Sequence, residues 1–180
     1  MDIHEYQSKE ILSEYGVPIA AGGLAYSPEQ AAYRATEIGG DAWVVKAQIH
    51  SGARGKAGGI KVCKSEDEVA KAAEELLGKK LVTHQTGPQG KVCHRLYVEA
   101  GCNIDREIYM AFVLDRQKES VTVVASAEGG MEIEQLAIEK PDSIIKIAVE
   151  AAVGMQPFQA REIVFALGLD KSQVNQAVTT

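Results

Sequence analysis

Two β-rich runs, residues 42–49 and 60–64, flank a loop that contains four glycines together with Arg54 and Lys56. Glycines let backbone N–H groups approach phosphate oxygens closely, and consecutive amides form a concave surface that binds anions. Arg54 and Lys56 would add positive charge at the loop tip, and Lys46 would reach in from the first strand. The pattern therefore predicts a hairpin whose loop lies along an anion, and a triphosphate is the favoured anion.

Two commoner phosphate-binding loops do not match this stretch. A Walker loop has Ser or Thr after its Gly-Lys, whereas Gly55-Lys56 is followed by Ala57. The run Gly52-Ala53-Arg54 lacks the second glycine of a dinucleotide fingerprint. On the loop alone, a basic surface loop or a weak RNA-binding tip stays open as an alternative.

Two carboxylates stand near the middle of the chain. Glu99 ends one predicted strand and Glu107 begins the next, so both could face a cleft and accept hydrogen bonds from ribose hydroxyls or an adenine amino group. Solvated strand ends are the alternative. The spacing of His84, His94 and Cys93 supports neither a metal site nor a nucleophile, so we expect these three to be structural or at the surface.

Composition limits the class of protein. With 180 residues, 46% hydrophobic and 24% charged, the chain can form one core or two small lobes. A net charge of -6 argues against a dedicated nucleic-acid binder. Cys63, Cys93 and Cys102 show neither a disulfide framework nor zinc-ligand spacing. The absence of a signal peptide and of a membrane-length apolar run favours a reducing cytoplasm or a mitochondrial matrix, with no membrane partner.

Local signals predict an α/β chain with two lobes. Residues 1–20 form an opening helix and linker that we expect to pack on the second lobe, residues 21–102 form the first lobe, and 103–180 begin the second, with the boundary near 101–105. The predicted helices are 2–15, 28–38, 66–77, 131–139, 157–167 and 171–180. The predicted strands are 18–24 (a linker ending in a short strand), 42–49, 60–64, 81–86, 95–100, 107–115, 121–126 and 144–149.

Several of these elements carry specific side-chain expectations. The opening helix is predicted to be amphipathic; its apolar residues are Ile3, Tyr6, Ile11, Leu12 and Tyr15. Ser27 and Ser65 are predicted N-caps, each followed three residues later by Gln or Glu. Trp43 is expected in the core and His50 is expected to anchor the loop.

Several long motifs together resemble the N-terminal part of the β subunit of the succinyl-CoA synthetase family. They are residues 1–7, 45–50, 55–59, 82–86 and 128–134, with Glu99 and Glu107 in register. Three further runs, 24–31, 51–55 and 156–161, are similar to the malate–CoA ligase branch of that family. The motifs occur in the same order as in the family and cover essentially the whole chain.

The resemblance implies an ATP-grasp fold, in which two α/β lobes clamp a nucleotide. It also implies a ligase that converts ATP (or GTP), CoA and a dicarboxylic acid to acyl-CoA, nucleoside diphosphate and phosphate, through a phosphohistidine on a partner α subunit. Mg²⁺ would bridge the phosphates. The implied partners are this α subunit and the nucleotide, not a nucleic acid or a membrane.

The resemblance assigns site residues of the family to the matching positions of this chain. Lys46 matches the phosphate-contacting lysine of the family, and Ala53-Arg54-Gly55 matches its glycine-rich lid. Glu99 and Glu107 match its nucleotide-binding glutamates, and Cys102 stands where a hinge backbone group meets the base. None of these residues is a nucleophile. The alternatives are a carboxylate–amine ligase lobe of the same fold and a non-catalytic module that binds nucleotides or nucleic acid.

Two departures from the family pattern have consequences. Ala53 replaces a residue that is usually glycine, which matters if this position needs a positive φ. The family subunit is also much longer, and its magnesium ligands would lie beyond Thr180, so no metal ligand is assigned within this chain. We therefore expect a fragment that contacts the nucleotide on one wall and is inactive alone.

Overall fold

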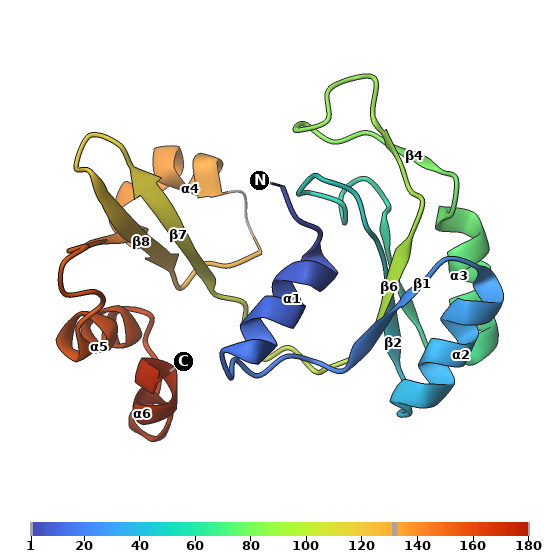
Figure 1. Ribbon diagram of the computed structural model, residues 1–180, viewed down its shortest axis with the longest axis horizontal. Coiled ribbons are helices and arrows are strands. Elements are labelled where there is room, and N and C mark those ends of the chain that lie inside the picture. Colours follow the sequence, from blue (N-terminus) through green and yellow to red (C-terminus); the bar gives the residue numbers. More distant parts are fainter. Residues whose placement is uncertain (1, 131–132, 180) are drawn as a thin grey trace. The chain divides into compact units, whose positions relative to one another are not determined.

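The computed structural model describes residues 2–130 and 133–179 (Figure 1). The chain divides into two compact units, Met1–Asn103 and Ile104–Thr180. We describe each unit by itself. The functional division into lobes, and the packing of residues 1–20 on the second lobe, stay predictions.

The first unit is built on a four-stranded antiparallel sheet. Its strands are β1 (Gly22–Ala25), β2 (Trp43–Ala47), β3 (Ile60–Cys63) and β6 (Leu96–Ala100). They lie in the order β1-β6-β2-β3, so β6 inserts between β1 and β2. The pair β2–β3 is the predicted hairpin around the glycine-rich loop, with Lys46 opposite Ile60.

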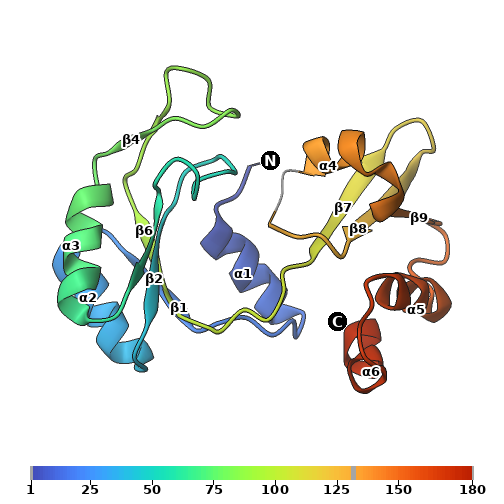
Figure 2. The same cartoon turned by 180° about the vertical axis from the view of Figure 1, so that it is seen from behind.

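Helices α2 (Pro28–Ile38) and α3 (Glu66–Leu76) cover one face of this sheet (Figures 1 and 2). Both begin as predicted, because the Ser27 hydroxyl accepts a hydrogen bond from the Gln30 amide and Ser65 accepts one from Glu68. The core between helices and sheet is formed by apolar side chains; it includes Ala31, Ala35, Trp43, Val45, Val69, Leu76, Leu96 and Val98. The prediction that Trp43 is a core residue is confirmed.

Helix α1 (Glu5–Glu14) lies on the opposite face of the sheet from α2 and α3 (Figures 1 and 2). Its apolar side chains are not buried within this chain: Ile11 is 46% exposed, Leu12 45% and Tyr15 83%. The helix instead turns its polar face to the sheet. The predicted opening helix is present, and within the first unit its contacts with the sheet come from its polar side chains.

One strand prediction was wrong. The run 81–86 pairs only at β4 (Lys80–Leu81), which joins β5 (Lys91–Val92) in a two-stranded ladder. Beyond it, the Thr83 amide donates to the Thr86 hydroxyl over 2.9 Å, and the Thr86 amide donates back to Thr83. These reciprocal bonds close a turn, because threonine hydroxyls compete with ladder hydrogen bonds for the backbone amides.

The second unit contains a three-stranded antiparallel sheet in the order β7-β8-β9. Its elements are β7 (Tyr109–Asp115), β8 (Ser120–Ser126), α4 (Ile133–Glu139), a 3-10 turn η1 (Pro141–Ser143), β9 (Ile145–Val149), α5 (Pro157–Ala166) and α6 (Lys171–Thr179). Helix α5 packs on the sheet through Ile163, beside Val123 and Ala125. The predicted helix residues 131–132 and 180 lie outside the described residues.

Candidate functional site

The alternation of β-strands places two of the predicted site residues on one face of the first sheet. In β2, Val45 points into the core beneath α2 and α3, so its neighbour Lys46 points to the opposite face, which α1 covers. Lys46 pairs in register with Tyr97 of β6, and Glu99 lies two residues further along the same strand. Lys46 and Glu99 therefore meet under α1.

Five charged side chains form an ionic cluster in this position; they are Glu5, Lys9, Lys46, Arg54 and Glu99. The Glu99 side chain is only 7% exposed and forms ion pairs with both lysines. Lys46 Nζ also lies 3.0 Å from a Glu5 oxygen, and Arg54 Nη2 lies 2.7 Å from the other. Three cations face two carboxylates, so the ionic cluster carries a net charge of +1. Such a cluster suits an anionic ligand.

The cluster perturbs the titration of Glu5. Burial alone would raise its pKa, but the charges of Arg54 and Lys46 and the hydrogen bonds from both outweigh burial and lower the pKa from 4.5 to about 2. Glu5 is therefore an ionised carboxylate at any physiological pH.

A pH-dependent stability follows from this lowered pKa. Glu5 stabilises the folded state above pH 4.5, the pKa of the unfolded chain, and this contribution is lost as the pH falls from 4.5 towards 2. We expect Glu5→Gln to lower the free energy of unfolding by about 1–2 kcal/mol at pH 7, since two cations lose their counter-charge. Denaturant unfolding of both proteins between pH 7 and 3 should show this difference shrinking below pH 4.5. A difference that grows with acidification would contradict the assignment.

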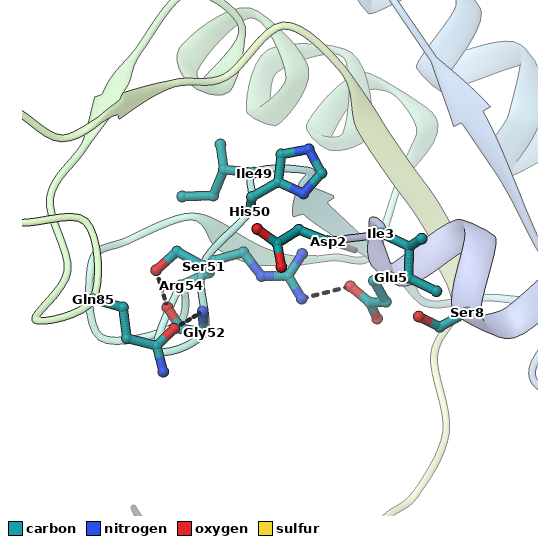
Figure 3. Close-up of a pocket in the computed structure, with 10 residues that line it drawn as sticks. All are labelled: Asp2, Ile3, Glu5, Ser8, Ile49, His50, Ser51, Gly52, Arg54 and Gln85. Atoms are coloured by element: carbon teal, nitrogen blue, oxygen red, sulfur yellow. Dashed lines mark hydrogen bonds and ion pairs between the residues drawn. The ribbon is translucent and has the colours of Figure 1, made fainter. Parts of the chain in front are cut away.

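The glycine-rich loop folds back on the sheet. The Arg54 guanidinium donates 2.7 Å to the carbonyl of Ala47, and the Arg54 carbonyl accepts from the Gly59 amide over 2.8 Å. The Gly52 amide donates 2.6 Å to Oε1 of Gln85, in the turn that replaced the predicted strand. Arg54 was predicted at the loop tip, and the structure turns its side chain back towards Glu5 (Figure 3).

Ala53 adopts a left-handed backbone conformation, with φ of 55°. A Cβ in this region costs roughly 1–2 kcal/mol, which glycine avoids at a smaller cost in unfolded-state entropy. We expect Ala53→Gly to raise the free energy of unfolding by about 0.5–1 kcal/mol. The matched control is Ala57→Gly in the same loop; φ of Ala57 is not positive, so this substitution should destabilise. If Ala53→Gly and Ala57→Gly change the stability by the same amount in thermal unfolding, the backbone at Ala53 is not strained.

A pocket of about 490 Å³ opens beside the ionic cluster (Figure 3). It is lined by Asp2, Ile3, Glu5, Ser8, Ile49, His50, Ser51, Gly52, Arg54 and Gln85. Glu5 and Arg54 belong to both the pocket wall and the cluster. The pocket therefore connects the glycine-rich loop with the start of α1, and both come from the first unit.

His50 stacks on His4, with ring centroids 3.9 Å apart. This contact confirms the expectation that His50 anchors the loop. Burial, together with the charges of His50, Arg95 and Arg54, lowers the pKa of His4. The stacked rings hold the residues just before α1 beside the loop.

The remaining predicted site residues are not part of the ionic cluster. Gly55 and Cys102 are exposed in the first unit, and Glu107 is exposed in the second. Their assignment as nucleotide contacts stays a prediction. Among residues 2–130 and 133–179 no group of three or more His, Cys, Asp or Glu is arranged to hold a metal ion. No helix in that part of the chain is long and apolar enough to span a membrane.

Three residues of this site, Glu5, Lys9 and Gln48, were not predicted from the sequence. Glu5 and Lys9 belong to α1, and the Gln48 amide donates 3.3 Å to Glu5. The i, i+4 spacing of Glu5 and Lys9 signalled a charged helix face. Hydrophobic periodicity identifies the apolar face of a helix but does not show which partners its charged face has.

The sequence is similar to proteins of established families. Residues 2–180 match the family model described as an ATP-grasp domain. Over its whole length the chain is 60% identical to a probable malate–CoA ligase subunit beta of Mesorhizobium japonicum. It is 54% identical over 99% of its length to a succinate–CoA ligase [ADP-forming] subunit beta of Nautilia profundicola. In both comparisons the chain spans 46% of the relative, so it covers about half the length of these proteins.

Solved structures show the same fold at lower identity. One is a dinucleotide-forming acetyl-coenzyme A synthetase 1 of Ca. Korarchaeum cryptofilum, in complex with coenzyme A and Ca-AMPCP. It aligns with a TM-score of 0.71 and 21% identity, over 99% of this chain and 77% of that one. ATP citrate lyase of Methanothrix soehngenii aligns with a TM-score of 0.63 and 20% identity, over 93% of this chain and 43% of that one.

Proposed function

The chain belongs to the ATP-grasp family, and from this we propose that it is the nucleotide-binding part of the β subunit of an acid–CoA ligase. The observation that carries the proposal is its similarity to β subunits of malate–CoA and succinate–CoA ligases over essentially its whole length. The complete enzyme would convert a nucleoside triphosphate, CoA and succinate or malate to acyl-CoA, nucleoside diphosphate and phosphate, through a phosphohistidine on a partner α subunit. The chain alone would be inactive.

In this proposal Lys46 and Arg54 bind the oxygens of the triphosphate. Support comes from their convergence: their nitrogens lie 3.0 and 2.7 Å from the two oxygens of one carboxylate, a spacing that also suits a phosphate group. Ala53 and Gly55 flank Arg54 in the lid. Neither cation forms a covalent bond; each neutralises charge and fixes the orientation of the polyphosphate.

Glu99 would position Lys46 and accept hydrogen bonds from the ribose. Its ion pairs with Lys9 and Lys46 support the first of these roles. We further propose that the backbone at Cys102 meets the base and that Glu107 is a nucleotide contact. Mg²⁺ would be held by residues outside the described ones, and when bound would neutralise charge on the phosphates. The compartment we propose is reducing, the cytoplasm or a mitochondrial matrix.

The proposal is tested by assaying the complete β subunit together with its α partner. Succinate and malate should be compared, each with ATP and with GTP, by following acyl-CoA formation. We expect activity with one of the two acids to depend on both subunits. Acid activation by an amine acceptor in place of CoA, without an α subunit, would instead identify the protein as a carboxylate–amine ligase.

A further inference from the structure

The carboxylate of Glu5 is the focus of three hydrogen-bond donors. Lys46 Nζ donates over 3.0 Å to one oxygen, while Arg54 Nη2 over 2.7 Å and Gln48 Nε2 over 3.3 Å donate to the other. The donors come from β2 and from the loop that follows it, whereas Glu5 comes from α1. One ammonium, one guanidinium and one amide converging on a single anion form an anion-binding site. In this structure an internal side chain fills it.

The contacts that hold α1 on the sheet are polar. No residue of the helix is buried. Besides the Glu5 contacts, Lys9 pairs with Glu99, the Tyr6 amide donates 3.3 Å to Gln48, and Arg95 donates 3.4 Å to the Tyr6 hydroxyl. An incoming anion can replace carboxylate contacts of this kind, because it satisfies the same cations. It could not replace an apolar interface.

We propose that Glu5 is an internal substitute for a phosphate group, occupying the subsite formed by Lys46, Gln48 and Arg54 until the polyphosphate of a nucleotide displaces it. This inference rests on the proposed function and adds to it a residue that sets nucleotide affinity. A polyphosphate and the Glu5 carboxylate cannot share the three donors, since two like charges at one site repel each other. Glu5 is ionised at neutral pH, so it leaves by moving, not by taking up a proton.

Displacement of Glu5 predicts how the apparent nucleotide affinity changes when Glu5 is replaced. If Glu5 occupies the subsite for most of the time, only a fraction of molecules is competent to bind, and the apparent affinity falls by that fraction. Removing the charge of Glu5 should therefore tighten nucleotide binding, although it weakens the free protein. A residue that merely preorganised Lys46 and Arg54 for the ligand would give the opposite change in affinity.

The test is calorimetric titration of ATP, and separately of inorganic tripolyphosphate, into three proteins. These are the unmodified protein, Glu5→Gln, and Glu14→Gln as a matched control, since Glu14 is an exposed carboxylate at the end of the same helix. We expect Glu5→Gln to bind both ligands about 5- to 10-fold more tightly, and Glu14→Gln to bind like the unmodified protein. Tripolyphosphate isolates the effect at the phosphate subsite from any effect on the base.

A second measurement needs no substitution and covers the case in which Glu5→Gln fails to fold. Hydrogen exchange of the α1 amides should become faster in the unmodified protein at saturating tripolyphosphate, because the helix loses the Glu5 contacts that help to hold it on the sheet. The amides of α3 serve as the internal control and should not change. Slower or unchanged exchange in α1 would contradict displacement.

The outcomes separate this inference from the proposed function. If the unmodified protein binds ATP but Glu5→Gln binds with equal or lower affinity, Glu5 is not the internal occupant and nucleotide binding still stands. If none of the three proteins binds ATP or tripolyphosphate, both the proposed function and the inference are wrong.

Discussion

Lys46→Ala is expected to weaken ATP binding by about 10- to 150-fold, the loss that follows from removing one charge-assisted phosphate contact worth about 1.5–3 kcal/mol. The physical reason lies in the position of Lys46. Its side chain is 19% exposed and held between Glu5 and Glu99, so its ammonium is partly shielded from water. Removing it also takes one of the two cations from the charge of Glu99. The measurement is a calorimetric titration of ATP into both proteins.

The matched control for this experiment is Lys61→Ala. Lys61 belongs to β3, the strand next to β2, and its Nζ lies 3.2 Å from Glu75 with both side chains more than 40% exposed. It carries the same charge but lies outside the ionic cluster, so ATP affinity should change less than twofold. Equal affinity of the Lys46→Ala and unmodified proteins would favour a non-catalytic module in which the glycine-rich loop contacts another partner.

Much of the fold followed from local signals. The serine caps of α2 and α3, the glycines that end them and the hairpin around the glycine-rich loop all depend on short-range chemistry. The run 81–86 was misjudged because its composition is typical of a strand, whereas the reciprocal Thr83–Thr86 bonds turn the chain. That choice between ladder and turn depends on side-chain geometry, which composition does not specify.

The site was predicted only in part, because one of its elements is joined to the others by contacts between residues far apart in sequence. Lys46 and Glu99 were identified by motif, and strand alternation explains why they meet. The third element of the site, α1, is joined to them by charges separated by more than forty positions in sequence, as in the pair Glu5 and Lys46. No local pattern predicts such pairing. Lys46 and Glu99 are largely shielded from water and need charged partners, but the sequence does not show that α1 supplies them.

Glu99→Leu is expected to lower the free energy of unfolding by about 3–5 kcal/mol, because Lys9, Lys46 and Arg54 are then left in a largely buried place with Glu5 as the remaining carboxylate of the cluster. The Glu99 side chain is 7% exposed, so water cannot replace the lost partner. The measurement is denaturant unfolding at pH 7.

We attribute the large loss of stability in Glu99→Leu to the burial of the ion pair. The substitution Glu75→Leu, at an exposed ion pair, tests this attribution. Glu75 also pairs with a lysine, but its side chain is 49% exposed, so Glu75→Leu should cost less than about 1 kcal/mol. A triple variant with Lys9→Met, Lys46→Met and Glu99→Leu should regain most of the stability lost in Glu99→Leu, since Glu5 and Arg54 then remain as a balanced ion pair. If the triple variant is no more stable than Glu99→Leu, the loss comes from packing around Glu99. In that case the ionic cluster serves the ligand and contributes little to the fold.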